Sequence, residues 1–395
     1  MLLRHEALAD IEFLNTALEE RFAYLRARPI DYRSLFEALR GRMPDEVGVS
    51  WLGLELQKVL AHSIDGHAGM NAAPSPVGYL PFLTRSVGDA LVAFQPDRSG
   101  PVDHERPYLV AIDGVQVAEW LAAAAAYVPE GSPQLVRRES LRWLRAVQML
   151  REDMGLPQGG EVEVSLAGKG GGSPLELRLA VAEKVPQFGL WPLSESGILD
   201  DDVGYLRLAR MTPEAGAEVR GRLLRFQGTA GLVVDVRGNG GGSRDALLAL
   251  LPSLLRWSRQ EREALEAFLA GFEPEWRPPA AEFSAWHAMV VSPADHDAPR
   301  YHGRPVVVLM DDGCFSATDV FLSALKGLPD VVLVGEASSV GQRACPGSGA
   351  ASFWAEGTAR LYGVVPGLRG VVRRARRAAG RDSETEAGVL RDGRP

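Results

Sequence analysis

The stretch GLVVDVRGNGGGSRDALLALLPSLL, residues 231–255, joins a continuous apolar run to a glycine-rich turn and a second, longer apolar segment. A short apolar run that ends in glycines indicates a buried strand, and the longer segment indicates a helix. The same order returns in RPVVVLMDDGCFSATDVFLSALKGL, residues 304–328, and DVVLVGEASSVG, residues 330–341, adds another buried strand. Buried strands that alternate with helices predict an α/β domain whose sheet is covered on both faces.

This β/α pattern extends from about residue 186 to residue 395. It begins with the strand pattern DVGYLRLARM, residues 202–211, and the helix pattern AEVRGRLLRFQ, residues 217–227. A long segment rich in Trp and Pro, residues 258–303, interrupts it. An insertion of this length inside a compact domain is typical of a lid or a rim over a functional site.

Two different regions precede the β/α domain. Residues 1–75 carry apolar residues at helical spacing and are expected to be mostly helical. Residues 76–185 are expected to form a small mixed β domain. Within it, EVEVSLAG (161–168) and PLELRLAVA (174–182) alternate apolar and polar side chains around a glycine-rich turn, which predicts a hairpin.

Composition excludes several classes of function. The chain has 395 residues and a net charge of −8, which argues against a nucleic-acid binder. No apolar run is long enough for a transmembrane helix, and acidic residues interrupt the N-terminus where a signal peptide needs an apolar stretch. We therefore expect a cytoplasmic protein that does not bind membranes.

No cofactor, metal site or disulfide framework is expected either. The chain has only two cysteines, Cys314 and Cys345, and its His residues are not spaced as metal ligands. The glycines of residues 238–242 lack the Lys-Ser/Thr pair of a phosphate-binding loop.

Small residues follow the apolar run RPVVVLM, residues 304–310, and Ser316 lies among them. One interpretation is a tight turn without chemistry. The other is a nucleophilic serine, with the N–H of Ala317 and that of Gly241 or Gly242 as oxyanion donors. Two turns of small residues follow two strands of one sheet, the glycine turn at 238–242 and the turn with Ser316. Their occurrence together favours an oxyanion site.

A serine nucleophile needs a base, and His67 in SIDGHAGM, residues 63–70, is the best candidate. A loop places this imidazole by its backbone, which suits an active-site base. The alternative is an ordinary surface histidine. His62, on the preceding helix, is expected to be structural.

The three core segments together resemble the C-terminal processing (tail-specific) protease family. The resemblance rests on GLVVDVRGNGGG, RPVVVLMDDGCFSATDVF and VVLVGEASSVG, in this order, and extends to the DGH loop and the segment PYLVAIDGVQV. It implies a crotonase-like core, a PDZ-like domain over residues 76–185, and a nucleophile at Ser316 in the run Ser316-Ala317-Thr318-Asp319.

The resemblance also bears on the base. Many members of the family use a Ser-Lys pair, but the position of that Lys holds Gly341 or Gln342 here. Lys326 lies ten residues after Ser316 on the expected helix, about 15 Å along its axis and out of reach. The tricorn-like branch of the family instead uses a His from the N-terminal half, which favours His67.

A carboxylate is expected to orient the imidazole of His67, and Asp319 and Glu336 are the two candidates. Sequence does not choose between them, because Asp319 also fits a helix cap and Glu336 also fits a turn. Cys314 is an alternative nucleophile in the same turn. It stands two residues before the matching position, so its side chain is expected to pack elsewhere.

Three functions remain open at this point. The favoured one is a serine peptidase that cleaves peptides near their C-termini, with the PDZ-like domain binding the substrate. The second is a hydrolase of a small ester, amide or carbamate with the same Ser316/His67 pair. The third is a non-catalytic protein that binds apolar ligands, like the retinoid-binding relatives of this fold. A homo-oligomer is compatible with all three.

Overall fold

The computed structural model describes residues 1–22, 30–170, 172–186, 195–243, 245–254, 303–328 and 330–339. The described residues up to 186 form one compact unit, and those from 195 to 339 form a second. Residues 258–302 of the predicted insertion lie outside the described residues, and only its last residue, Gly303, is described. Gly341, Gln342 and Cys345 also lie outside the described residues. None of the described helices is both long and apolar enough to cross a lipid bilayer.

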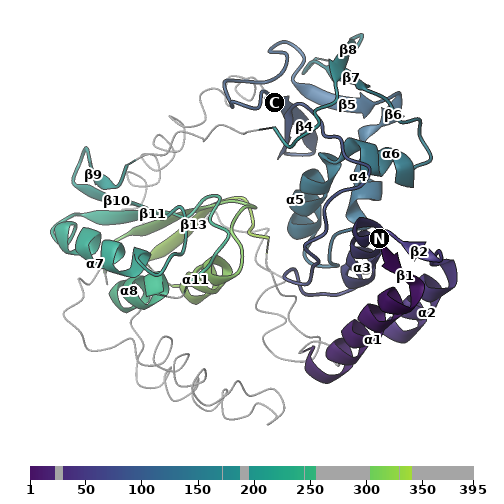
Figure 1. The fold of residues 1–395 in the computed structure, drawn as a ribbon. Helices are drawn as coiled ribbons and strands as arrows, with labels where there is room; N and C mark the ends of the chain where they lie inside the picture. The colour runs from purple at the N-terminus through teal and green to yellow at the C-terminus, as the bar shows by residue number, and fades with distance from the viewer. Residues whose placement is uncertain are drawn as a thin grey trace. The chain divides into compact units, whose positions relative to one another are not determined.

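The first unit begins with the helices predicted from the sequence (Figure 1). They are α1 (Arg4–Arg21), α2 (Tyr32–Arg42) and α3 (Val49–Ala61), and two short strands, β1 (Leu2–Leu3) and β2 (Glu46–Val47), pair antiparallel beside them. Buried side chains such as Ile11, Phe36 and Leu39 form their common core. Asp31 begins α2 by accepting a hydrogen bond from the Ser34 N–H at 3.0 Å, as N-cap residues do.

A six-stranded sheet follows in the same unit. Its strands are β3 (Leu83–Val87), β4 (Ala90–Phe94), β5 (Tyr108–Ile112), β6 (Val115–Gln116), β7 (Glu161–Ala167) and β8 (Leu175–Ala180). They run in the order β3-β4-β5-β7-β8, with β6 paired to β5. The predicted hairpin is confirmed, since β7 and β8 pair antiparallel from Glu161 opposite Ala180 onward. Asp113 and Gly114 connect β5 to β6 with φ of 50° and 73°, the conformation of a tight hairpin turn.

Three helices accompany this sheet: α4 (Val117–Ala125), α5 (Pro133–Leu144) and α6 (Val147–Asp153). Trp120, Leu144 and Leu150 are fully buried in the core that these helices share with the strands. The segment SLRWLRAVQMLREDMG, residues 140–155, has apolar residues at helical spacing throughout, but the structure ends one helix at Leu144 and begins the next at Val147. The break lets both pieces turn an apolar side toward the sheet.

The second unit contains a five-stranded sheet (Figure 1). Its strands are β9 (Gly197–Leu199), β10 (Val203–Arg207), β11 (Gly231–Asp235), β12 (Val306–Met310) and β13 (Val331–Gly335). Strands β10 to β13 are parallel neighbours in chain order, and β9 pairs antiparallel at the edge. The strands predicted for the β/α domain are therefore confirmed.

Helices α7 (Ala215–Arg225), α8 (Asp245–Leu254) and α11 (Ala317–Leu325) connect these strands. All three share one core cluster with one face of the sheet, which includes Leu232 and Val308. Parallel strands added in one direction by right-handed crossovers place their helices on the same face. Val233 and Val307, on the opposite face, are also fully buried, as the prediction of a sheet covered on both faces requires.

This topology gathers three loops at one edge of the sheet. The carboxyl ends of parallel strands meet at a common edge, where α/β proteins bind their ligands. The loops after β11, β12 and β13 start there, and they carry the glycines of residues 238–242, Ser316 and Glu336.

Candidate active site

Ser316 lies between β12 and α11, at the N-cap of the helix. Its backbone has φ 59° and ψ −119°, a conformation that residues other than glycine rarely adopt. Such strain persists only where the surroundings hold it, and it concentrates at functional sites. Nucleophilic serines of several hydrolases lie in strained strand-to-helix turns, because such a turn exposes the serine hydroxyl.

Asp311 ties the serine turn to the glycine loop, residues 238–242. Its Oδ1 accepts hydrogen bonds from the Gly238 N–H at 2.7 Å and from the Gly313 N–H at 3.0 Å. The Phe315 N–H in turn donates to the Asn239 carbonyl oxygen at 3.1 Å. Bonds in both directions fix the two loops against each other.

Gly241 packs directly against the serine turn. A Cβ atom at this position would lie 2.6 Å from the Phe315 carbonyl oxygen, 2.8 Å from the Ala317 nitrogen and 2.8 Å from the Ser316 Cβ. Only glycine fits, and its φ of 89° also requires glycine. The structure thus brings Gly241, Ser316 and Ala317 together.

The geometry narrows the choice of oxyanion donors. The Gly241 N–H donates to Asn239 Oδ1 at 3.0 Å, so it is already used within the loop. The N–H groups of Ala317 and Gly242 make no hydrogen bond to any described residue. Ala317 is the first residue of α11, where N–H groups point outward and favour negative charge.

Cys314 is not suited to be the nucleophile. It is fully buried, and its Sγ donates to the Val236 carbonyl oxygen at 3.1 Å. Burial, followed by the charge of Asp311, raises the pKa of the thiol well above its usual value. A buried thiol of this kind is inert. The expectation that Cys314 packs elsewhere is confirmed.

The third loop closes over the same turn. The Ser339 N–H donates to the Cys314 carbonyl oxygen at 3.0 Å, and the Ser339 hydroxyl donates to the Asp312 carbonyl oxygen. Gly335, the last residue of β13, has φ 132°, and a Cβ there would lie 1.9 Å from the Met310 carbonyl oxygen. The VGE turn therefore needs its glycine in order to pass β12.

A buried charge cluster, which the sequence analysis missed, supports the start of the glycine loop. Asp235 has no exposed surface, and it accepts hydrogen bonds from Arg237 Nη2 at 2.6 Å and the Tyr205 hydroxyl at 2.7 Å. Burial alone would raise the pKa of this carboxyl, but Arg237 first and then Arg207 and Tyr205 outweigh it and lower the pKa. The sequence signal for this cluster was the D-x-R pattern formed by Asp235 and Arg237.

The remaining candidates on this unit lie around α11 and β13. Asp319, in the first turn of α11, is buried, and Glu336 directly follows β13 and is exposed. Lys326 is the C-cap of α11, whereas Ser316 is its N-cap. The prediction that Lys326 lies at the far end of this helix is confirmed.

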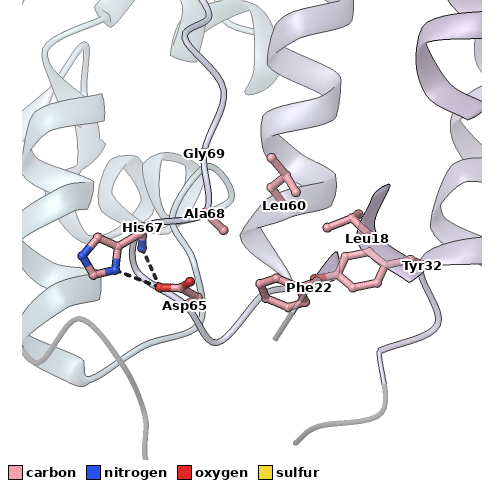
Figure 2. A pocket seen from close by; sticks show the side chains of 8 residues that line it. All are labelled: Leu18, Phe22, Tyr32, Leu60, Asp65, His67, Ala68 and Gly69. Atoms are coloured by element: carbon pink, nitrogen blue, oxygen red, sulfur yellow. Dashed lines mark hydrogen bonds and ion pairs between the residues drawn. The ribbon is translucent and has the colours of Figure 1, made fainter. Parts of the chain in front are cut away.

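His67 belongs to the first unit, in the loop after α3 (Figure 2). Its Nδ1 lies 2.9 Å from Asp65 Oδ1, which also accepts the His67 backbone N–H at 3.0 Å. The imidazole keeps 42% of its surface exposed, whereas Asp65 keeps 17%. A carboxylate on Nδ1 fixes the tautomer and leaves Nε2 as the basic nitrogen.

Sequence analysis named Asp319 and Glu336 as orienting carboxylates and missed Asp65. The signal was the spacing, since an Asp two residues before a His can form a local turn that bonds both its N–H and its ring. Ser316 lies in the second unit and His67 in the first. Their pairing stays a prediction.

Comparison with known proteins bears on the second unit above all. Residues 202–348 match the model of peptidase family S41. No curated protein matches the chain. Among solved structures, mature CPAF complexed with lactacystin has a TM-score of 0.59 and 18% identity, over 86% of this chain and 85% of the other. Mature CPAF has a TM-score of 0.57 and 17% identity, over 86% and 84%.

These identities are low, so the likeness to CPAF establishes a shared fold. The family match goes further, because its range contains the glycine loop, the Ser316 turn and β13. The match of residues 202–348 to peptidase family S41 supports a serine-type peptidase.

Proposed function

We propose that this protein hydrolyses peptide bonds through an acyl-enzyme, with Ser316 as nucleophile, His67 as general base and Asp65 as the residue that positions the imidazole. The proposal departs from a Ser-Lys mechanism. The observation that carries it is the hydrogen bond of 2.9 Å between Asp65 Oδ1 and His67 Nδ1, an arrangement that a surface histidine does not need.

The chemistry follows from the geometry of each half. Nε2 of His67 takes the proton of Ser316 Oγ as this oxygen attacks the scissile carbonyl carbon. The carbonyl oxygen becomes negative and accepts from the Ala317 N–H, with Gly242 as the second candidate donor. The imidazolium gives its proton to the leaving amine, and Asp65 stabilises the imidazolium meanwhile. Water then hydrolyses the ester with His67 as base once more.

The wider architecture supports a peptide as substrate. We infer that β10 to β13 with their helices form a crotonase-like core, because consecutive parallel strands carry helices on one face. We also infer that residues 76–185 act as a PDZ-like domain that binds the C-terminal end of the substrate. The antiparallel sheet of β3 to β8 and its helices support this assignment.

A labelling experiment tests the catalytic pair. The wild-type protein is treated with a fluorophosphonate, and the modified residue is located by mass spectrometry. Labelling at Ser316 that falls about 10²-fold or more in rate in His67→Gln supports the pair, since a general base contributes about 10²–10⁴. Labelling at an unchanged rate in His67→Gln would exclude His67 as the base. His62→Gln, on a neighbouring exposed histidine with Glu130 at 3.6 Å, is the matched control.

Substrate class needs a second measurement. Casein and peptides tagged at either end are compared with a panel of small esters, amides and carbamates. Cleavage of peptides near their C-termini supports the proposal, and turnover of the small acyl compounds alone replaces it with a biosynthetic hydrolase. A folded protein whose Ser316 reacts with no probe would instead be a binder of apolar ligands.

A further inference from the structure

A cavity of about 290 Å³ lies beside His67 in the first unit (Figure 2). Its apolar wall comes from three helices: Leu18 and Phe22 from the end of α1, Tyr32 from the start of α2, and Leu60 from the end of α3. Its other wall is the loop of residues 65–69, which carries the His67 imidazole. One cavity therefore joins an apolar surface to the proposed general base.

The apolar wall is built into the core. Leu18, Tyr32 and Leu60 are 8%, 3% and 5% exposed, and all three belong to the core that α1, α2 and α3 share. The rings of Phe22 and Tyr32 meet edge to face, with centroids 6.4 Å apart and planes at 85°. Packing of this kind fixes the positions of the side chains that form the apolar wall.

Tyr32 contributes its ring to this wall. Its hydroxyl is buried and has no hydrogen bond of normal geometry to a described residue, and the Ser63 side chain hydrogen-bonds closely enough to lower its pKa against the larger effect of burial. In Figure 2 the Tyr32 ring extends from its helix toward the side of the cavity where Asp65 and His67 lie. Buried hydroxyls nearly always have a partner, and Ser63 is the one in reach here, so Tyr32 offers a ligand its ring rather than its hydroxyl.

Charge limits which ligand fits. Asp65 lines the cavity next to the imidazole, and its carboxylate repels anionic groups. The volume lies at the lower limit of small-molecule pockets, which span about 300–1,000 Å³. The space thus suits one bulky neutral side chain and excludes an extended ligand.

We infer that this cavity, named here the Tyr32 pocket, receives one large apolar side chain of the peptide substrate. The inference rests on the proposed function, because it takes His67 to be the base of that reaction. The pocket then selects which residue of a peptide lies next to the imidazole.

Binding without turnover tests the pocket. Ser316→Ala protein with ¹⁵N-labelled histidine is titrated with N-acetyl-phenylalanine amide, N-acetyl-alanine amide and N-acetyl-aspartate amide. The His67 ring signals, assigned with His67→Gln, are followed by NMR. We expect saturable shifts with the phenylalanine amide, affinity at least tenfold weaker for the alanine amide, and no response to the aspartate amide.

Two variants in the same background make the test specific. Phe22→Trp fills the pocket and should weaken phenylalanine-amide binding at least tenfold. Tyr32→Phe keeps the ring that forms the wall and should leave phenylalanine-amide binding within about threefold of the parent protein. Phe13→Trp is the control, because Phe13 is on the same helix but 76% exposed and outside the pocket. Thermal unfolding confirms that each variant is folded.

The two proposals fail in different ways. Equal responses of His67 to the phenylalanine and alanine amides, or binding unchanged in Phe22→Trp, would overturn the pocket whatever the labelling of Ser316 shows. The other outcome is that phenylalanine amide binds selectively but Ser316 is labelled equally fast in His67→Gln. That result would support the pocket and exclude the Ser316/His67 pair.

Discussion

Gly241 lies so close to Ser316 that a Cβ on the glycine would lie 2.8 Å from the Cβ of the serine. Carbon atoms that are not bonded to each other do not approach to this distance. Gly241→Ala must therefore displace the serine turn or the glycine loop, and its φ of 89° adds about 1–2 kcal/mol of strain. We expect fluorophosphonate labelling of Ser316 to slow at least tenfold and the free energy of unfolding to fall.

Gly240→Ala is the matched control for this change. A Cβ on Gly240 meets no atom within 4 Å, and its φ is not positive. It should label at the wild-type rate. Equal rates for both variants would show that the close contact at Gly241 does not hold the serine in place.

Asp65→Asn tests the group that positions the imidazole. The amide keeps the shape of the carboxylate but removes its charge, so the imidazolium loses its stabilisation. We expect kcat/KM for a peptide to fall about 10²-fold or more, within the range of general acid–base catalysis. Asp319→Asn and Glu336→Gln are measured beside it. A larger loss in either of these than in Asp65→Asn would return the orienting role to the carboxylates predicted from sequence.

Alkylation with iodoacetamide tests the chemical state of Cys314. In a Cys345→Ser background, the native protein should remain unmodified at neutral pH, because burial raises the pKa of this thiol and no surface is exposed. The same protein in denaturant should react fully. Cys314→Ala should keep its activity and lose about 1 kcal/mol of stability with the hydrogen bond to Val236. An inactive but folded Cys314→Ala would make the thiol a participant.

Acid unfolding tests the Asp235 cluster. The pKa of Asp235 is lower in the folded protein than its ordinary value of about 4. Its contribution to stability is therefore fully present above pH about 4 and is lost as the pH falls through the folded pKa. Asp235→Asn should be less stable at pH 7 by about 3–5 kcal/mol, because Arg237 keeps a buried charge without its partner.

The variant should also lose less stability than the wild type between pH 5 and pH 2, as measured by urea unfolding at each pH. Tyr205→Phe keeps the carboxylate and loses only one hydrogen bond, so its pH dependence should stay close to that of the wild type. A pH dependence unchanged in Asp235→Asn would show that another group controls acid unfolding.

Sequence was sufficient to predict most of the second unit, because its strands are short apolar runs that end in glycine. The strands at 231–235 and 306–310 each have a neighbouring strand on both sides in the sheet. Central strands of this kind appear in a sequence as short continuous apolar runs. The position of Ser316 at the start of a helix followed from the same pattern. Its positive φ did not, because no residue type announces this conformation as glycine does.

Details that depend on hydrogen bonds were harder to predict. Asp65 was not predicted as the partner of His67, because a carboxylate two residues away reaches the ring only in one local turn geometry. The use of the Gly241 N–H within its own loop could not be foreseen, since it depends on which way the Asn239 side chain turns. The Tyr32 pocket escaped too, because its walls come from three helices that look like ordinary core.

The carboxylate of Asp311 has a consequence for inhibition. Its Oδ1 accepts hydrogen bonds from both Gly238 and Gly313, and the Asn239 carbonyl oxygen accepts one from Phe315. Because of these bonds, we expect the glycine loop and the serine turn to move together. A compound that binds under either loop and displaces it should therefore displace the other loop as well. Such a compound should inactivate Ser316 without contacting its hydroxyl.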